Sequence, residues 1–231
     1  MGRTVIVGDV HGCRYELEAL LAHLEFSKKE DRLVLVGDLV IRGPDPHGVL
    51  AVVDKYGGRS VRGNHENKLL SIRAGANRGG EHADLAEDLS KSEWALIEAM
   101  PLWIDLPDHG VRVVHAGVVP GQSVKSTPPE ALFTMRALDE DGRWNAEKGT
   151  KPLWGAKYAG PPHVIFGHNA LTEPQLHPWA TGIDTACVYG GRLSAIVLDA
   201  SEPMPRGAKA QRKLVSVPAR RTYFESKQSP R

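Results

Sequence analysis

Two pairs of chemically active residues stand close together in the chain. Asp9 and His11 are separated by one residue, directly after an apolar run, and Asn64 and His65 are adjacent. Carboxylate oxygens, amide oxygens and imidazole nitrogens are all ligands for divalent transition metals. We therefore interpret both places as parts of a metal site.

Three further residues extend this set, each at a point where a strand is expected to end. The ends of parallel strands meet at one edge of a sheet, where α/β folds bind ligands, so residues far apart in the chain can share one site. The candidate ligands are Asp9, His11, Asp38, Asn64, His115 and His168.

Three oxygen donors and three imidazoles are too many for one catalytic metal that keeps open positions. They suit two metals about 3.5–4 Å apart with one shared carboxylate, a centre that lowers the pKa of bound water towards ~7 and hydrolyses phosphorus or carbonyl esters. Arg42, which follows Asp38 by four residues, favours phosphorus. A planar guanidinium can bind two oxygens of one phosphate.

The elements that must position these residues follow from hydrophobic periodicity. The runs 4–7 and 32–36 predict buried strands, each followed by Gly-Asp, and a third strand leads through 57–62 towards Asn64. Apolar spacing predicts helices over 17–24 and 48–55. This repeated strand–loop–helix order predicts a mainly parallel sheet covered by helices.

The later chain continues the pattern less regularly. Residues 66–100 are predicted to be helical and to cover the sheet, with a break at 75–80. Strands are expected at 102–106, 111–114 and 164–166, the last two just before His115 and His168.

Two predictions concern the last third of the chain. One short helix is expected over 129–138. The runs 183–188 and 192–198, separated by Tyr189-Gly190-Gly191, predict a β-hairpin.

Composition indicates one large domain with a distinct end. The chain has 231 residues, is 41% hydrophobic and 25% charged, and has a formal net charge of +1, which gives no general reason to bind nucleic acid or membrane. Residues 201–231 contain eight Lys or Arg and two Glu. We expect a catalytic domain over 1–200 and a basic, partly disordered extension over 201–231, in which 213–217 could add an edge strand.

The sequence also favours a cytoplasmic protein. Cys13 and Cys187 do not resemble a disulfide framework, and no apolar run approaches the ~20 residues of a membrane-spanning helix. The first residues run directly into a strand, which argues against a secretion signal.

Five blocks together resemble the calcineurin-like metallophosphoesterases, specifically their phosphoprotein-phosphatase branch. The resemblance extends over about 8–198. Its blocks are Gly8–Gly12, Gly37–Gly43, Gly63–Glu66, His115–Gly117 and Gly167–His168. Within that branch, Ile41 and the run 183–191 look more like the symmetrical diadenosine tetraphosphatases.

The resemblance implies a four-layer α/β/β/α sandwich of two mixed sheets flanked by helices. It also implies two divalent metals, with manganese favoured and iron, zinc, cobalt or nickel compatible with the donors. The implied roles are Asp9 and His11 on the first metal, Asp38 as bridge, Asn64, His115 and His168 on the second metal, His65 as general acid, and Asn64 and Arg42 on phosphate.

Protein phosphatases of this branch carry an Asp immediately before the signature arginine, and this chain has Ile41 there. We therefore expect His65 to be oriented by a different acceptor.

A second phosphate-binding arginine is expected at Arg136, with Arg143 as the alternative. Glu66 is interpreted as a structural acceptor at a helix start. The histidines without a matching block are expected to be ordinary surface or core residues: His23, His47, His82, His109, His163 and His177.

The function expected from these features is hydrolysis of a phosphoanhydride in a nucleoside polyphosphate such as diadenosine tetraphosphate, by in-line attack of a metal-bridging hydroxide. Alternatives are a serine/threonine protein phosphatase, which Ile41 opposes, a phosphatase of polynucleotide ends, which only the basic tail favours, and a metal-dependent binding module without turnover. The expected partners are thus a small nucleotide or a phosphoprotein, and no membrane.

Overall fold

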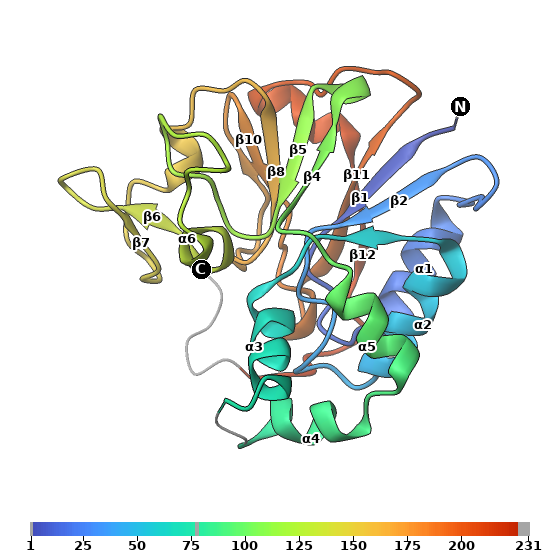
Figure 1. Cartoon of the computed structure of the whole chain (residues 1–231). Coiled ribbons are helices and arrows are strands. Elements are labelled where there is room, and N and C mark those ends of the chain that lie inside the picture. Colours follow the sequence, from blue (N-terminus) through green and yellow to red (C-terminus); the bar gives the residue numbers. More distant parts are fainter. Residues whose placement is uncertain (1, 77–78, 226–231) are drawn as a thin grey trace.

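The computed structural model describes residues 2–76 and 79–225 and contains two five-stranded mixed sheets with helices on their outer sides (Figure 1). The first sheet has the order β12-β11-β1-β2-β3. Its strands are β1 (Thr4–Val7), β2 (Arg32–Leu35), β3 (Arg59–Ser60), β11 (Arg192–Leu198) and β12 (Leu214–Pro218). β1, β2 and β3 are parallel, and β11 runs antiparallel to β1, with Ile6 opposite Ile196.

The second sheet has the order β4-β5-β8-β10-β9. Its strands are β4 (Trp103–Leu106), β5 (Val111–Val114), β8 (His163–Phe166), β9 (Gln175–Leu176) and β10 (Ala180–Gly182). β5, β8 and β10 are parallel, whereas the edge strands β4 and β9 are antiparallel to their neighbours. A separate two-stranded ribbon consists of β6 (Ala137–Leu138) and β7 (Trp144–Asn145).

Six α-helices lie in the described part of the chain. They are α1 (Arg14–His23), α2 (Pro46–Tyr56), α3 (Asn64–Arg73), α4 (Glu81–Asp88), α5 (Lys91–Glu98) and α6 (Pro129–Thr134). The sequence sets the bounds of α2 locally. Asp45 accepts a hydrogen bond from Gly48 N at 2.7 Å, Pro46 occupies the first turn, and Gly57 ends the helix with φ of 64°.

Strand alternation divides the core into layers. Val5 and Val7 of β1 pack with apolar residues of α1, α2 and α5 on the outer face of the first sheet. Ile6 points the other way and packs with Val113 and Ile165 of the second sheet. The far side of the second sheet packs against α6 and Trp154. This is the four-layer α/β/β/α sandwich that the resemblance implied, in place of the single mainly parallel sheet that periodicity predicted.

The predicted hairpin at 183–188 and 192–198 is wrong. β10 ends at Gly182 in the second sheet, and β11 pairs with β1 and β12 in the first sheet, so the connection crosses between sheets. The crossing contains Ala186 with φ of 62° and Gly190 with φ of 89°, both incompatible with a continuing strand. Two apolar runs beside a Gly-Gly turn resemble a hairpin, but 192–198 pairs with β1 and β12, and it meets 183–188 at an isolated bridge between Ala186 and Arg192.

The predicted helix over 129–138 is correct only in its first part. α6 ends at Thr134, because Met135 is extended and the following backbone pairs in the ribbon with β7. Arg136 N donates to Asn145 O at 2.9 Å. Ala137 and Leu138 are therefore strand residues.

Part of the basic extension packs onto the domain. Residues 207–213 form a 3₁₀ turn, and β12 adds the expected edge strand beside β11. Beyond β12, Arg220 N and the Tyr223 hydroxyl both donate to the Glu16 carboxylate of α1. The expected disorder concerns residues that include 226–231, which lie outside the described residues.

Among the described helices, none has the length and apolar character that crossing a bilayer requires.

The buried carboxylate of Glu66 joins two loops at the sheet edge, one after β2 and one after β3. It accepts hydrogen bonds from Asp38 N at 3.0 Å, Leu39 N at 2.8 Å and Gly63 N at 2.9 Å. Burial, with the nearby Asp38 charge, raises the pKa of Glu66 to about 7, and the hydrogen bonds oppose that rise. The predicted structural role of Glu66 at a helix start is confirmed.

We predict that Glu66→Ala lowers the free energy of unfolding by about 3 kcal/mol, because it leaves buried N–H groups without acceptors. Urea titration followed by circular dichroism measures this. Glu87→Ala, an exposed glutamate of α4, is the control and should change stability by less than about 0.5 kcal/mol. Equal stability of the two variants would contradict the role of Glu66.

Candidate active site

The strand ends bring all six candidate metal ligands to one edge of the two sheets. Asp9 and His11 follow β1, Asp38 follows β2, and Asn64 begins α3 just after β3. From the second sheet, His115 follows β5 and His168 follows β8.

Asp38 is the centre of this cluster. Its Oδ2 lies 3.5 Å from His115 Nε2 and 3.6 Å from His11 Nε2. His65 Nε2 lies 3.8 Å from the same oxygen. All four side chains are buried. One carboxylate oxygen therefore faces imidazoles from both sheets.

Asp9, Asn64 and His168 complete the cluster. Asp9 Oδ2 lies 4.0 Å from His11 Nε2 and accepts a hydrogen bond from His168 N at 3.0 Å. Asn64 Oδ1 lies 3.1 Å from His115 Nε2. The contact between Asp9 and His168 links two residues that are 159 positions apart in the chain.

Backbone carbonyls orient two of the imidazoles. His115 Nδ1 lies 2.8 Å from Val36 O, and His11 Nδ1 lies 3.4 Å from Val40 O. With Nδ1 as the donor to a carbonyl, Nε2 carries the lone pair and faces the cluster.

The loops that carry these residues adopt costly backbone conformations. His11, Asp38 and His168 have φ of 47°, 50° and 63°, and Ile41 and Arg42 have φ of 71° and 75°. The left-handed region is unfavourable for residues other than glycine, with costs of order 1–3 kcal/mol, and such strain concentrates at functional sites.

Burial controls the charge of the cluster. It lowers the pKa of His11 to about 3 and that of His168 well below its ordinary value, so both are neutral at pH 7. Burial also raises the pKa of Asp9, and the carboxylates of Asp184 and Asp38 add to this. Asp38 behaves differently: burial works to raise its pKa, but four surrounding histidines, His115 first, lower it overall.

These residues fit two divalent cations. Two ligand groups share Asp38, one with His11 and His65 and the other with His115 and His168, and within each group the ligand atoms lie within 4.8 Å of one another. The buried Nε2 atoms of His65 and His168 have no hydrogen-bond partner among the described residues. Neutral imidazoles with free lone pairs around buried carboxylates are the donor set that such ions require.

His65, which the resemblance implied to be a general acid and not a metal ligand, lies within the first ligand group. Its Nε2 is grouped with His11 and Asp38, the place expected for Asp9. Its other nitrogen, Nδ1, lies 2.8 Å from Nε2 of His82, and the two rings are stacked with centroids 5.0 Å apart.

His82 therefore takes the place expected for the acceptor beside His65, while the Ile41 side chain is buried in the core. His82, expected to be an ordinary surface or core residue, is thus in contact with a candidate site residue. No signal in the sequence could have found it, because it stands in a charged helical segment without a motif.

Arg42 and Arg136 both direct positive charge at the cluster. Arg42 Nη1 lies 3.1 Å from His11 Nε2, and Arg42 N donates to Glu81 Oε1 at 2.6 Å. Arg136 donates to Ala146 O at 2.8 Å, and after burial it is the largest cause that lowers the pKa of His168. The alternative, Arg143, is an exposed residue paired with Asp141 at 3.2 Å.

Sequence reasoning did not single out Asp184 or Lys148 as site residues. Burial raises the pKa of Asp184 to about 6, and the charges of Arg42 and Arg136 oppose this rise. Burial lowers the pKa of Lys148, and the same two arginines lower it further. Asp184 lies in the run 183–191 on which the resemblance partly rested, whereas Lys148 stands in a polar loop without a pattern.

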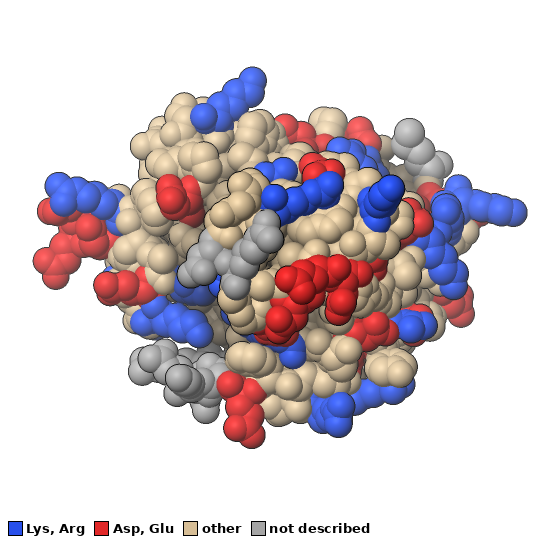
Figure 2. All heavy atoms as spheres, turned by 60° about the horizontal axis from the view of Figure 1, so that its bottom comes forward, with Lys and Arg blue, Asp and Glu red and all other residues tan. Residues whose placement is uncertain are grey.

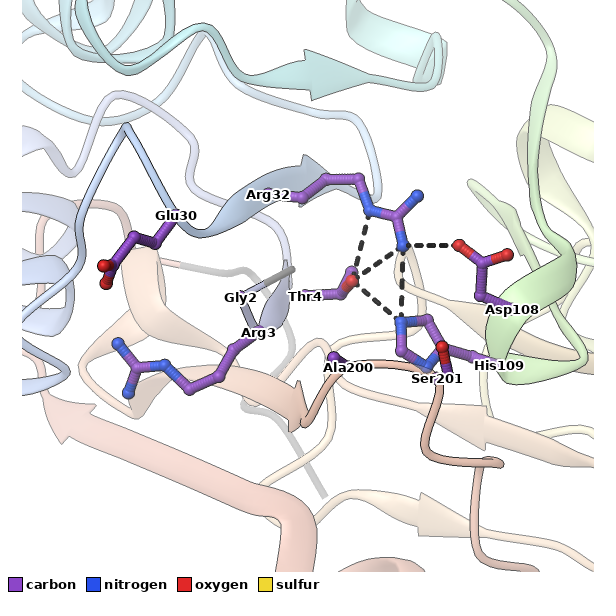
Figure 3. A pocket seen from close by; sticks show the side chains of 9 residues that line it. All are labelled: Gly2, Arg3, Thr4, Glu30, Arg32, Asp108, His109, Ala200 and Ser201. Carbon is purple, nitrogen blue, oxygen red and sulfur yellow. Dashed lines mark hydrogen bonds and ion pairs between the residues drawn. The ribbon is translucent and has the colours of Figure 1, made fainter.

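A pocket at the amino-terminal end of β1 has a different character (Figure 3). Arg32 lies 3.5 Å from Asp108 and bonds to Thr4 Oγ1 there, and Arg3 pairs with Asp31 at 2.7 Å. Both arginines are thus paired with carboxylates of the protein.

Comparison with known proteins gives a family match over residues 2–198, to the model described as calcineurin-like phosphoesterase. The symmetrical bis(5'-nucleosyl)-tetraphosphatase of Shewanella oneidensis is 35% identical over 180 residues, which are 72% of this chain and 65% of that protein. The chain thus spans just under two thirds of the length of the Shewanella relative. The asymmetrical bis(5'-nucleosyl)-tetraphosphatase PrpE of Oceanobacillus iheyensis is 31% identical, over 82% of this chain and 86% of that protein.

Solved structures agree with the family match. A crystal structure described as that of a candidate diadenosine tetraphosphatase superposes with a TM-score of 0.81 at 39% identity, covering 94% of each chain. A protein serine/threonine phosphatase of Saccharomyces cerevisiae shares the fold, with a TM-score of 0.58 at 15% identity over 99% of this chain and 81% of that one. From the family match, the relatives and the shared fold we conclude that this chain belongs to the calcineurin-like phosphoesterase family.

Proposed function

We propose that the protein is a dinuclear metal-dependent phosphohydrolase that cleaves phosphoanhydride bonds of nucleoside polyphosphates, with dinucleoside tetraphosphates as the favoured substrates. The observation that carries the proposal is the Asp38-centred cluster with three cationic side chains around it: Arg42, Arg136 and Lys148. The names of the relatives support the same substrate class.

The family implies a dinuclear divalent-metal centre. The residues that would hold the ions are Asp9, His11, Asp38, Asn64, His115 and His168. When bound, the ions supply an acidified water and positive charge for the phosphoryl oxygens. We favour manganese, and mixed carboxylate and imidazole donors also accept iron, zinc, cobalt and nickel.

The cations around the cluster favour a substrate with several phosphates. Arg42 and Asn64 lie at the cluster and bind the phosphoryl group that reacts. Arg136 and Lys148 add two charges: besides burial, the charge of Arg42 lowers the pKa of Arg136, and the charges of Arg136 and Arg42 lower the pKa of Lys148. A chain of phosphates supplies anions to all three cations, whereas a single phosphate does not need them all.

His65 is proposed as the general acid that donates to the leaving oxygen, and His82 as the residue that positions it. The bond between His65 Nδ1 and His82 Nε2 contains one proton. As an acid, His65 is the imidazolium, which carries a proton on each nitrogen. Nδ1–H then donates to Nε2 of His82, the acceptor, and the second proton, on Nε2, faces the cluster. This is the nitrogen from which a leaving group could receive it.

The alternatives have weaker support. Likeness to the serine/threonine phosphatase is at the level of fold alone. On the face drawn in Figure 2, basic and acidic side chains of the described residues are mixed, so that face offers no continuous basic track for a polynucleotide.

The free, buried thiols of Cys13 and Cys187 support our proposal of a reducing, cytoplasmic location.

The direct test is hydrolysis of diadenosine tetraphosphate by purified, manganese-loaded protein, with separation of the nucleotide products. We expect turnover that chelation abolishes and manganese restores. His115→Ala should remove activity, because it takes a ligand from the cluster. Phosphate release from a phosphopeptide without cleavage of the dinucleotide would replace this function with protein phosphatase activity.

Arg136→Ala should raise KM for diadenosine tetraphosphate about tenfold or more, since charge-assisted hydrogen bonds contribute about 1.5–3 kcal/mol and 1.4 kcal/mol is a factor of ten. Steady-state kinetics measure this. Arg143→Ala is the matched control and should leave KM unchanged, because Arg143 is exposed and paired with Asp141. If only Arg143→Ala raised KM, Arg143 and not Arg136 would be the second phosphate-binding arginine.

His65→Ala should slow hydrolysis of aryl phosphates with poor leaving groups about 10²-fold or more, and affect good leaving groups much less. His82→Ala should also reduce kcat for substrates with poor leaving groups, by about tenfold, with KM unchanged. His47→Ala, which removes a histidine paired with Glu93, is the control. Equal losses with good and poor leaving groups would refute the general-acid role.

A further inference from the structure

Two aromatic rings flank the guanidinium of Arg42. Its central carbon lies 5.7 Å from the ring centroid of Tyr189 and 5.8 Å from that of Phe224. The two rings meet edge to face, with centroids 6.2 Å apart. Tyr189 belongs to the 3₁₀ turn that follows Asp184, whereas Phe224 comes from beyond β12 and outside the family match over 2–198.

The segment that carries Phe224 is attached to the domain at two places. Tyr223 N and Phe224 N both donate to Val188 O at 3.0 Å, which joins the segment to the turn that contains Tyr189. The Tyr223 hydroxyl donates to Glu16 Oε1 at 2.8 Å. Buried Glu16 and the turn therefore fix the position of the Phe224 ring beside Arg42.

The Phe224 ring is accessible to a ligand. It is 39% exposed and is one of two large exposed hydrophobic side chains among the described residues, the other being Tyr15. Tyr189 is half-buried. Burial raises the pKa of Tyr189, the charge of Arg42 lowers it, and the carboxylates of Asp184 and Asp9 raise it, in keeping with the contact of its ring with Arg42.

We propose that Phe224 and Tyr189 form the binding site of a nucleobase, with the base stacked on the exposed face of Phe224. The proposal rests on the proposed function, because Arg42 then binds a phosphate of the same nucleotide. Only the ribose and any intervening phosphate separate that phosphate from the base. Stacking on an aromatic ring is available to every base, so the site recognises the presence of a base more than its identity.

A competing explanation is that the two rings only hold Arg42 in place through cation–π contacts. The two explanations differ in one measurable respect. A base site matters only for ligands that carry a base, whereas a support for Arg42 matters equally for every phosphate ligand.

The test measures binding of ADP and of inorganic pyrophosphate to the manganese-loaded protein by titration calorimetry. Phe224→Ala should weaken ADP binding about tenfold, the order that one base–aromatic stack contributes. Pyrophosphate binding should change by less than about twofold. Phe224→Trp, which keeps a stacking surface, should restore ADP binding, and Phe224→Leu should not.

Tyr15→Ala is the matched control, because Tyr15 is also exposed and also contacts an arginine, Arg220, at 4.5 Å. It should leave both affinities unchanged. Equal weakening of ADP binding and pyrophosphate binding by Phe224→Ala would show that the ring supports Arg42 and does not form a base site. Unchanged ADP binding would also refute the base site. Hydrolysis of diadenosine tetraphosphate by the wild-type protein tests the proposed function separately.

Discussion

The burial of the Asp38 carboxylate is the constraint on which the rest of the site depends. A buried carboxylate is costly unless donors or cations surround it. Here imidazoles of His11 and His115 face one of its oxygens, and the other accepts from His65 N at 3.1 Å. Glu66 in turn binds the backbone N–H of Asp38, so a second buried acid fixes the loop that presents the first.

The layered fold allows this burial because it joins two sheets at one edge. β1 and β2 deliver carboxylates, and β5 and β8 of the other sheet deliver imidazoles. The apolar contacts of Ile6 with Val113 and Ile165 hold the sheets face to face. Loss of packing between the sheets would therefore separate acids from histidines, which couples the stability of the core to the integrity of the site.

Local order around the site also depends on the end of the chain. The segment after β12 binds Glu16 and the turn at Val188, and so brings Phe224 to Arg42. Arg42 itself has a left-handed backbone and a short hydrogen bond to Glu81. The guanidinium is thus positioned by elements from three parts of the sequence.

Short-range sequence patterns determined the parallel strands, the helices and, through five ordered blocks, the family and the six residues that gather at the sheet edge. These features depend on the period of apolar residues and on motifs a few residues long, which one sequence contains. Tertiary structure alone decided that His82 reaches His65, that Arg136 is half-buried whereas Arg143 is exposed, and that 183–198 crosses between sheets instead of forming a hairpin. The reason is physical: each of these depends on contacts between distant segments, and neither periodicity nor a local motif specifies which distant segment packs against which.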